Sequence, residues 1–546
     1  MFKQLLYTVI FILLFIACND DQVIPLKNVY IESVTINGKS VSNGGSVSGM
    51  AVDSVVIQIT FSSAIDKNKF NPEALFFSMG IDTGFVIMKD TFSRQLNFKI
   101  NRRLNYYTSY TLYVTEGEQL GVKILDPYTF TFITALDYTP KFPVIPDDSL
   151  LTLVQKHTFA YFWDHAHPTS GLARERYGSG ETVTSGGSGF GIMTIPVAIE
   201  RGFITRQQGF ERLQTIVNFL NTKAERFHGA YPHWLNGTSG KTQPFSTKEN
   251  GADLVETAFL IQGLLTVQQY FKTGNSAEKA MCDTIQKIWE AVEWSWFQQN
   301  GQQKLFWHWS PNYNWEMNMP VSGWNEGLIV YVLAASSPTY PISKTVYDEG
   351  WARNGAMKNG RTFYDIKLPL GEDRGGPLFF THYSFLGLDP RNLSDQYANY
   401  MEQNIAHARI NHAYCVANPK GYYSYGADCW GLTASDIPDG YTASSPNNDR
   451  GTIAPTAALS SIPYTPEESM RALNFFYYTL GDRLWGTYGF KDAFNLNKRW
   501  FAPSYLAIDQ GPIVVMIENY RTGLLWNLFM QNEEVRSGLA KLGFSY

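Results

Sequence analysis

Hydrophobic and polar residues alternate along the first quarter of the chain. The runs "NVYIESVTING", "DSVVIQITFS", "RQLNFKI", "SYTLYVTEG" and "YTFTFIT" place β-branched or aromatic side chains at nearly every second position, with turn residues between the runs. A period of two residues is typical of strands that bury one face. We therefore expect residues 28–136 to form a small all-β sandwich. Its sequence carries no recognisable chemistry.

The pattern changes after a proline-rich segment, "DYTPKFPVIPDD", which predicts a semi-rigid linker over 137–148. The remainder, 149–546, shows helical periods with no strand alternation. This pattern favours one α-domain, an α/α toroid of helical hairpins whose inner helices are apolar on every side and project polar residues from their ends into a central cleft. Helices are expected at 149–164, 190–201, 205–225, 249–272, 276–298, 323–335, 394–416, 466–480 and 511–531, and with less support at 341–354, 377–386 and 532–541.

The stretch "KENGADLVETAFLIQG", 248–263, places three carboxylates at the start of an apolar segment. Ser246 and Glu249 have the spacing of a capping box, which predicts that a helix starts there. On that helix Glu249, Asp253 and Glu256 share one stripe, at i, i+4 and i+7. The stripe continues with leucines, so we expect the acids to face a cavity and at least one pKa to be raised. A simple capping role for Glu249, or a favourable helix-dipole position for Asp253 and Glu256, explains the same residues.

A second acid, Glu326, stands before the apolar run in "VSGWNEGLIVYVLAA", 321–335, next to Trp324. An acid in the first turn of a helix is one explanation. The other is a carboxyl group in a cleft, beside an indole that holds a sugar ring. Two carboxyl groups from different helices are what glycosidic cleavage needs, since one protonates the leaving oxygen and the other acts on water or carbon.

Further candidates for substrate binding lie in loops and at helix ends. Tyr231, His233 and Trp234 occur together in "GAYPHWLNG", and His382 lies among aromatic residues, where a core histidine is an equal explanation; Asp509 and Gln510 precede another apolar helix. The chain has no HExxH zinc motif and no GxSxG nucleophile elbow. We therefore expect neither a metal nor a cofactor.

Composition narrows the class of protein. The chain has 546 residues and a net charge of −5, and aromatic residues make up 15% against 17% charged residues. An acidic chain of this kind argues against nucleic acid as a partner. Surfaces rich in aromatic side chains suit stacking on sugars, although a large core needs them as well.

The N-terminus, "MFKQLLYTVIFILLFIACNDDQ", has a short apolar run after Lys3 that ends at Cys18. It resembles a bacterial lipoprotein signal over 1–17, with Cys18 as the lipidated residue and a polar tether over 18–27. This implies an exported protein of a Gram-negative bacterium, anchored in the outer membrane and facing the periplasm or the cell surface. An uncleaved membrane anchor is the alternative. Of the remaining cysteines, Cys415 and Cys429 could form a bridge, but we expect Cys282, Cys415 and Cys429 to be buried free thiols.

Residues 150–541 resemble the bacterial glucoamylase-like domain of glycoside hydrolase family 144. The matching stretches are "FGIMTIPVAIERGFIT", "NGADLVETAFLIQGLL", "GWNEGLIVYVLA", "GGPLFFTHYSFLGLDPR" and "GPIVVMIENYRTGLLWNLF". The resemblance implies an (α/α)6 barrel and inverting hydrolysis of β-1,2-linked glucose chains, by an endo-glucanase or by an exo-enzyme that releases sophorose. It places the acidic cluster on Asp253, Glu256 and Glu326, with Glu249 where an aspartate is expected. The N-terminal sandwich resembles bacterial immunoglobulin-like modules.

The expected function is therefore β-1,2-glucan hydrolysis, with Glu326 as general acid and Asp253 as base. The long loops 228–248 and 417–453 favour exo release of sophorose, because long loops in compact domains usually serve a function and these could close one end of the cleft. Endo-cleavage remains the alternative, and a carbohydrate-binding lipoprotein without turnover is the alternative from another class. A polysaccharide lyase would need basic residues where this cleft is acidic.

Overall fold

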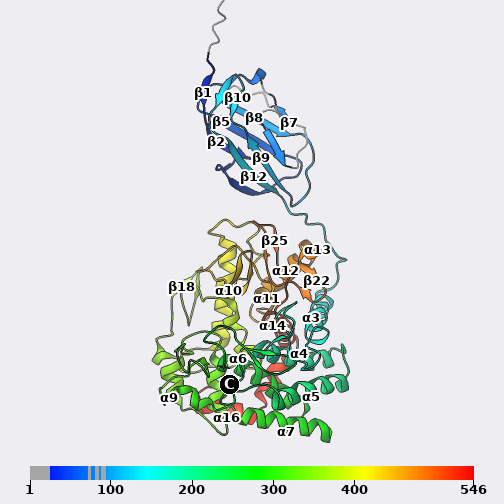
Figure 1. The fold of residues 1–546 in the computed structure, drawn as a ribbon, viewed down its shortest axis with the longest axis vertical. Helices are drawn as coiled ribbons and strands as arrows, with labels where there is room; N and C mark the ends of the chain where they lie inside the picture. Colours follow the sequence, from blue (N-terminus) through cyan, green and yellow to red (C-terminus); the bar gives the residue numbers. More distant parts are fainter. Residues whose placement is uncertain (1–24, 70, 72–75, 80–84, 88–93) are drawn as a thin grey trace, which may run out of the picture. The chain divides into compact units, whose positions relative to one another are not determined.

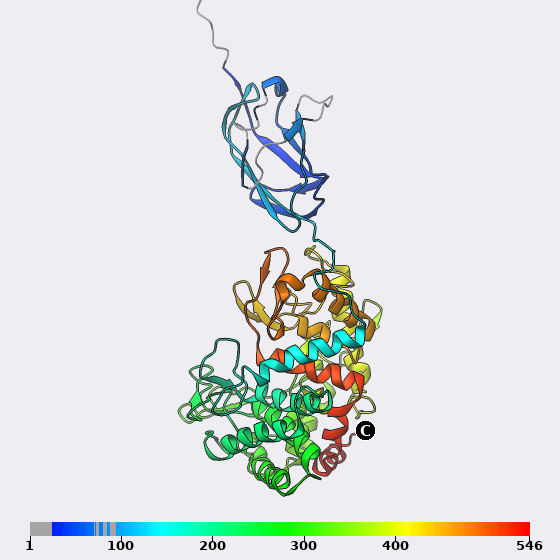
Figure 2. The same ribbon diagram turned by 90° about the vertical axis from the view of Figure 1, so that its right-hand side faces the viewer.

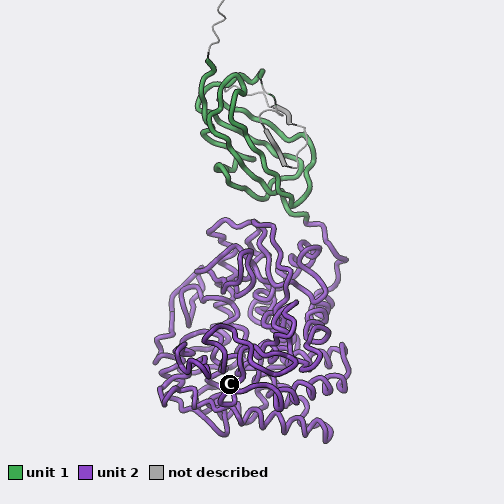
Figure 3. Tube along the Cα trace, viewed as in Figure 1, with its two compact units in different colours: residues 1–137 green, residues 138–546 purple. Residues whose placement is uncertain are grey.

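The computed structural model describes residues 25–69, 71, 76–79, 85–87 and 94–546. The expected signal peptide over 1–17, and Cys18 with it, lie outside the described residues. The chain divides into two compact units, 1–137 and 138–546 (Figure 3). Within the described part of the chain no helix has the length and apolar character needed to cross a membrane.

The N-terminal unit is all β. A five-stranded sheet has the order β3-β2-β5-β8-β7, a four-stranded sheet the order β4-β12-β9-β6, and a small sheet the order β1-β11-β10. Inward-facing residues of the two larger sheets, such as Ile57, Phe98, Leu112 and Phe130, share one hydrophobic core, so the expected sandwich is present. The strands are β1 Lys27–Val29, β2 Ile31–Ile36, β3 Lys39–Val41, β4 Gly45–Met50, β5 Val56–Phe61, β6 Phe76–Met79, β7 Phe85–Ile87, β8 Gln95–Ile100, β9 Ser109–Val114, β10 Gly117–Gln119, β11 Val122–Ile124 and β12 Tyr128–Thr134.

The second unit is an (α/α)6 toroid. The helical pattern predicted a toroid of helical hairpins, and the family resemblance implied the (α/α)6 form. Its inner ring consists of α4 Ser185–Glu200, α6 Leu254–Phe271, α8 Leu328–Ser336, two short 3-10 helices Leu378–Thr381 and Ser384–Leu386, α11 Pro455–Leu459 and α14 Ala507–Arg521. Neighbours pack in that order from α4 to Ser384–Leu386, and from α11 through α14 back to α4. Hydrogen bonds from the Tyr464 hydroxyl to the Thr381 carbonyl oxygen and between His382 and Ser461 join these two runs and close the ring. Side chains of α8 and α11 are all buried, as are nearly all of α6 and α14.

The outer helices cover this ring. They are α3 Asp147–Trp163, α5 Arg206–Thr222, α7 Ser276–Glu290, α9 Lys344–Val346 with its continuation Tyr347–Trp351, α10 Tyr400–Ala417, and α12 Pro466–Asn474 with Phe475–Thr479. Three further helices, α13 Gly481–Leu484, α15 Leu524–Met530 and α16 Glu533–Leu542, complete the unit. Figure 1 shows α6 and α14 within the unit and α5, α7 and α9 at its edge, and Figure 2 shows α3 beside α14.

Short strands, grouped in one three-stranded sheet and five pairs, lie in the loops of the toroid. They are β13 Thr182–Thr184, β14 Trp234–Asn236, β15 Thr242–Gln243, β16 Ala252–Asp253, β17 His308–Trp309, β18 Thr362–Phe363, β19 Ile366–Lys367, β20 Ala434–Ile437, β21 Gly440–Ala443, β22 Trp485–Gly486, β23 Gly489–Phe490, β24 Phe494–Asn495 and β25 Trp500–Phe501. Sequence patterns did not predict them, because each pair is too short to show a period of two. Several of these pairs support the site described below.

Two features of the unit differ from, or refine, the sequence predictions. The helix predicted over 190–201 begins earlier, at Ser185, so that α4 includes a glycine-rich first part, and a Cβ at Gly263 of α6 would meet the Gly189 carbonyl oxygen at 2.2 Å. The glycines therefore let two inner helices pack backbone to backbone. The predicted linker over 137–148 is in part fixed to the toroid, since Phe142 packs on Tyr477 and the Lys141 amide donates to the Tyr478 carbonyl oxygen.

The three cysteines of the toroid, Cys282, Cys415 and Cys429, are buried and free. This confirms the prediction of unpaired thiols.

Candidate active site

A cavity of about 370 Å³ opens where the inner helices begin. Thr184 precedes α4, Glu256 lies in the first turn of α6, Glu326 precedes α8, and Leu506 precedes α14. The positive ends of these helix dipoles therefore converge on the cavity, which favours negative charge there. The lining residues are Glu175, Arg176, Thr184, His233, Trp234, Phe245, Glu256, Phe259, Trp307, Glu326, Phe379, Tyr383, Ala434, Tyr441, Leu506 and Ile508.

The start of α6 differs from the sequence prediction. The helix begins at Leu254, and the Asp253 carboxylate caps it by accepting hydrogen bonds from the Val255 and Glu256 amides at 3.1 and 3.0 Å. Glu249 lies in a separate turn, where its amide donates to the Ser246 carbonyl oxygen and its carboxylate accepts from the Ser246 hydroxyl. The predicted capping box and three-acid helical stripe are therefore wrong.

The three acids nevertheless belong to one cluster, because two histidines join them. His308 Nε2 lies 3.3 Å from Glu249 Oε1, and His308 Nδ1 lies 3.7 Å from Asp253 Oδ2. His233 Nδ1 is hydrogen-bonded to Asp253 Oδ2 at 2.9 Å, and its Nε2 lies 4.0 Å from Glu256 Oε1. Carboxylates and imidazoles thus alternate from Glu249 to Glu256. The pairing of β16 with β17, which sets Asp253 opposite His308, builds the arrangement.

The alternation shifts the pKa values of Asp253, His233 and Glu256 in different ways. Burial opposes ionisation of Asp253, but the hydrogen bond from His233 and the charge of His308 hold the pKa of this carboxyl below its usual value. Burial opposes protonation of His233, yet Glu256 and Asp253 raise its pKa to about 9. The pKa of Glu256 is raised by burial and by the charge of Asp253, while His233 acts against both.

Glu256 spans the gap between two inner helices. Its Oε2 accepts a hydrogen bond from the Gly186 amide at 2.7 Å, in the first turn of α4, and one from the Thr184 hydroxyl at 3.3 Å. A Cβ at Gly186 would lie 2.5 Å from that oxygen, so only glycine admits the carboxylate here. Oε1 points to His233 and has no shorter hydrogen bond within the described chain.

Glu326 lies just before the N-cap of α8 and lines the same cavity. Burial, followed by the charges of Asp253 and Glu256, raises the pKa of Glu326 to about 7. A carboxyl group with this pKa is half protonated near neutral pH, which is the property of a general acid. Its carbonyl oxygen accepts from the Ser384 hydroxyl, which ties the segment to the next inner helix.

A second group of acids adjoins the cavity lining, since Asp436 pairs with Arg176 and Asp509 follows Ile508. Asp509, in the first turn of α14, has no hydrogen-bond partner among the described residues other than the carboxyl group of Asp492, and it is 3% exposed. Burial and the neighbouring Asp492 raise its pKa well above the usual value. Burial and Asp436 raise the pKa of Asp492 to about 7. Asp436 is itself paired with Arg176 at 3.1 Å.

The predicted substrate-binding residues divide into two sets. His233 and Trp234 line the cavity. Trp324, 6% exposed, is turned away and donates from its indole nitrogen to His407 Nδ1 at 3.4 Å, so the expected sugar platform at Trp324 is wrong. Tyr231 is fully buried, with its hydroxyl on the Leu220 carbonyl oxygen.

Two further candidates are structural. His382 is hydrogen-bonded to the Ser461 hydroxyl at 2.9 Å, and burial lowers its pKa to about 3, so it is a neutral core histidine. Gln510 donates to the carbonyl oxygens of Tyr488 and Phe490. Neither lines the cavity, so a direct contact with substrate is not supported for either residue.

Sequence reasoning missed His308, Arg176, Asp436, Asp492 and Tyr441. His308 stands in "FWHWS", where alternating aromatic residues signal a strand-like segment but not a partner. The others come from loops without periodicity, and only the folded chain brings them together. The described residues hold no group of three or more side chains arranged to bind a metal ion.

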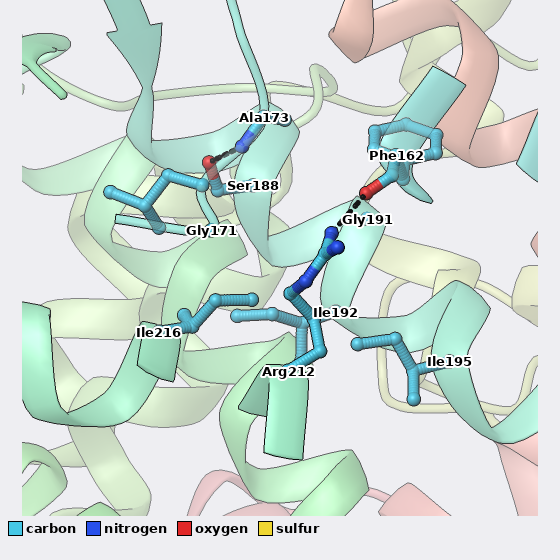
Figure 4. Close-up of a pocket in the computed structure, with 10 residues that line it drawn as sticks. Phe162, Gly171, Ala173, Ser188, Gly191, Ile192, Ile195, Arg212 and Ile216 are labelled. Atoms are coloured by element: carbon cyan, nitrogen blue, oxygen red, sulfur yellow. Dashed lines mark hydrogen bonds between the residues drawn. The ribbon is translucent and has the colours of Figure 1, made fainter. Parts of the chain in front are cut away.

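A second hollow, drawn in Figure 4, lies among α3, α4 and α5. Its volume of about 10 Å³ is room for about one water molecule. The Arg212 guanidinium donates to the carbonyl oxygens of Phe162 and Trp163, and the Ala173 amide donates to the Ser188 hydroxyl. These groups are satisfied within the protein, so the hollow is a packing defect and not a substrate site.

Comparison with known proteins adds sequence and structural relatives. A family model described as "Putative glucoamylase" matches residues 318–533. A crystal structure described as a putative glucoamylase from Bacteroides uniformis is 60% identical, with a TM-score of 0.73, and the match covers 74% of this chain and 99% of that one. An endo-β-1,2-glucanase from Chitinophaga pinensis, solved with sophorotriose and glucose, is 55% identical with a TM-score of 0.72, over 74% of this chain and 99% of that one.

A curated relative has a named exo activity. The exo β-1,2-glucooligosaccharide sophorohydrolase (non-reducing end) of Parabacteroides distasonis is 49% identical over 418 residues, which is 72% of this chain and 58% of that protein. The match therefore spans less than two thirds of the length of this relative.

Proposed function

We propose that this chain, which belongs to the glucoamylase-like family of glycoside hydrolases, family 144, hydrolyses β-1,2-glucosidic bonds in β-1,2-glucan or its oligosaccharides. The observation that carries the proposal is the meeting of Glu326 and Glu256 in one cavity. Relatives more than half identical over the whole toroid include an enzyme that acts on this linkage. Glycosidic cleavage requires one protonated and one ionised carboxyl group on opposite sides of the bond.

Glu326 is the general acid of this proposal. A pKa of about 7 keeps its proton available near neutral pH, and the same burial that raises the pKa strengthens its hydrogen bond to a leaving oxygen. Replacing Glu326 by Gln removes the proton and keeps the shape. Turnover should fall by roughly 10²–10⁴-fold with little change in binding. A variant with most of its activity intact removes Glu326 from this role.

The base is the second part of this proposal. Asp253 was the expected base; both its oxygens accept hydrogen bonds, the residue is 1% exposed, and it is not among the residues that line the cavity. We therefore propose that it holds His233 and the start of α6. The carboxyl groups left as candidates for the base are Glu256, whose Oε1 faces His233 in the cavity, and Asp509, which follows the lining residue Ile508 and is hydrogen-bonded to Asp492. The base is the one whose amide variant, Glu256→Gln or Asp509→Asn, loses turnover and the acidic limb of the pH–rate profile while still binding substrate.

Inversion at the anomeric carbon is part of the proposal. An inverting pair of carboxyl groups stands about 6.5–9.5 Å apart to admit a water molecule, against about 5–5.5 Å for a retaining pair. Proton NMR of the first product distinguishes the two. An α-anomer that appears before mutarotation supports inversion, whereas an initial β-anomer contradicts it.

Exo release of sophorose is the preferred mode of action. The loops 228–248 and 417–453 both contribute cavity walls, through Trp234 and Phe245 on one and Ala434 and Tyr441 on the other. The cavity of about 370 Å³ lies near the small end of the usual range for ligand sites, about 300–1,000 Å³, and fits a chain end better than a chain that crosses it. The curated relative from Parabacteroides distasonis is named as an exo-enzyme.

A time course with β-1,2-glucan and with β-1,2-glucooligosaccharides of defined length tests both levels of the proposal. Release of reducing ends supports hydrolysis, and tight binding without products favours a carbohydrate-binding protein instead. Sophorose as the sole early product from chains of different length supports exo action. A spread of intermediate oligosaccharides makes the protein an endo-glucanase.

The cellular location is a separate proposal, of an exported lipoprotein held in the outer membrane of a Gram-negative bacterium through lipidated Cys18. Its support is the pattern of residues 1–21, with an apolar run, Cys18 and then Asn19, Asp20 and Asp21. Expression of the full chain and of Cys18→Ser, followed by membrane fractionation, tests it. Equal distribution of the two proteins between membrane and soluble fractions contradicts a lipid anchor at Cys18.

A further inference from the structure

The hairpin of β20 and β21 brings an unusually placed aromatic ring to the cavity. Tyr441 lines the cavity and is 51% exposed. Among the described residues its hydroxyl has no hydrogen-bond partner and its ring touches no other ring. The other exposed aromatic residue of the lining, Phe245, packs on His233 at 4.3 Å and Trp234 at 4.8 Å. Tyr441 thus differs from Phe245 in having no aromatic neighbour against its ring.

The hairpin that carries Tyr441 is firmly anchored. Its two strands pair over four residues each, from Ala434 opposite Ala443 to Ile437 opposite Gly440. Asp436 accepts hydrogen bonds from Arg176 at 3.1 and 3.3 Å and from the Ser504 hydroxyl, and its amide donates to Asp492 Oδ2 at 2.7 Å. Arg176 also pairs with Glu175 at 2.9 Å. Three distant segments therefore hold the hairpin, which makes it a fixed wall and not a mobile lid.

Backbone pairing locates this wall. Arg176 and Leu506 form a β-bridge, and Arg176 also pairs with Asp436 on the hairpin. Tyr441, Ala434, Arg176 and Leu506 therefore form one continuous part of the cavity lining. The segment of Glu326 is tied to a different part of the ring, because its carbonyl oxygen accepts from the Ser384 hydroxyl.

We infer that Tyr441 is a specificity-determining residue, which stacks on a glucose unit at this wall of the cavity and stops the chain there. This inference rests on the proposed hydrolysis of β-1,2-linked glucose chains and adds to it the residue that sets the length bound. An aromatic ring held on an anchored hairpin loses little conformational freedom on binding, so the contact favours affinity for a glucose unit at that one position. Arg176 and Ala434 complete the same wall.

Variants at one position separate stacking from mere bulk. Tyr441→Phe keeps both ring faces, Tyr441→Leu keeps apolar volume without a ring, and Tyr441→Ala removes both. Tyr520→Ala is the matched control, because Tyr520 is also an exposed tyrosine, 45% exposed, and does not line the cavity. None of these side chains supports the core, so each variant should keep the melting temperature of the parent protein.

The measurement is kcat and KM on a β-1,2-linked trisaccharide and tetrasaccharide, together with the early products from long glucan. Tyr441→Ala and Tyr441→Leu should raise KM roughly ten-fold with kcat within two-fold, and should release a mixture of oligosaccharides in place of one disaccharide. Tyr441→Phe and Tyr520→Ala should match the parent in both respects.

The outcomes that overturn the inference differ from those that overturn the function. A parent protein that releases nothing from any of these substrates contradicts the proposed function itself. An active parent whose KM and products are unchanged in Tyr441→Ala contradicts only the role of Tyr441. An active parent protein that already releases mixed oligosaccharides contradicts the inference that Tyr441 stops the chain. A large fall in kcat for Tyr441→Ala at constant KM also contradicts it, and makes Tyr441 part of the chemical step instead.

Discussion

Replacing the proposed general acid should make the protein more stable, and only at neutral and alkaline pH. In the folded chain the pKa of Glu326 is about 7, against 4.5 for an ordinary glutamate, because burial and then the charges of Asp253 and Glu256 oppose its ionisation. In the unfolded chain these effects vanish. Above pH 7 the folded protein must therefore hold a charge that the unfolded chain carries more easily, whereas Gln at position 326 carries no charge in either state.

The magnitude follows from the two pKa values. Each unit of difference is worth 1.36 kcal/mol, so the rise from 4.5 to about 7 amounts to about 3 kcal/mol. Because the folded pKa is the higher one, the stability linked to the protonated carboxyl is fully present below pH 4.5 and is lost as the pH rises through 7. The advantage of Glu326→Gln should therefore be absent at pH 4, grow between pH 4.5 and 7, and level off above. For a toroid of about 400 residues, this corresponds to roughly 4 °C in melting temperature.

Differential scanning calorimetry of the parent and of Glu326→Gln, from pH 4 to pH 9, measures this difference for the transition of the helical unit. Exposed Glu349→Gln is the control, and its melting temperature should follow the parent at every pH. The reasoning is refuted if Glu326→Gln gives a constant offset across the range, or if it melts below the parent at pH 8. The same variant should lose turnover, so one substitution exchanges activity for stability.

Three further predictions concern groups around the site. His308→Gln removes one of the charges that lower the pKa of Asp253, so the pKa of this carboxyl, followed by carbon-13 NMR, should rise by roughly one unit, while an unmoved pKa assigns His308 a packing role only. Arg201→Met leaves buried Glu518 without its ion pair and should cost about 3–5 kcal/mol in urea unfolding, most of which the double variant Arg201→Met/Glu518→Leu should restore. Cys282, Cys415 and Cys429 should react with a thiol reagent only after unfolding, and fast labelling of the native protein would contradict their burial.

The inner helices could be predicted because burial on every side leaves a clear signal in the sequence. The apolar runs of α6, α8 and α14 all occur where expected, and Glu256 and Glu326 line the cavity at the ends of two of them. A long apolar run can be recognised from its own segment of the sequence, and an acid at its end stands out there.

The start of α6 could not be predicted, because two local solutions satisfy the same residues. Ser246 and Glu249 have the spacing of a capping box, yet they form a turn with each other, and Asp253 caps the helix. The pairing of β16 with β17, 55 residues further along the chain at His308, decides between the two. Long-range pairing of such short strands leaves no periodic signal.

The second acidic group was hidden for a similar reason. Asp436, Asp492 and Asp509 come from a hairpin, a loop and a helix, and each is unremarkable in its own segment. The prediction for Trp324 was wrong for the opposite reason. Its neighbour Glu326 suggested that the indole stacks on a sugar, whereas His407 on α10 holds the indole in the core. Adjacency in sequence predicts which side chains share an element, not the direction in which each one points.

Asp253 and Glu326 occupy similar positions in the fold, yet the pKa of one is lowered and that of the other is raised. Each stands at the start of an inner helix, where the dipole favours negative charge. Asp253 caps its helix through two amides and is hydrogen-bonded to His233, so its pKa is lowered in spite of complete burial. Glu326 lies one residue before the N-cap of α8 and makes no capping hydrogen bond to that helix. Burial, with the charges of Asp253 and Glu256, raises its pKa. A difference of one position relative to the helix start, together with the two histidines, is therefore enough to separate an ionised structural acid from a protonated one that can give its proton to a leaving group.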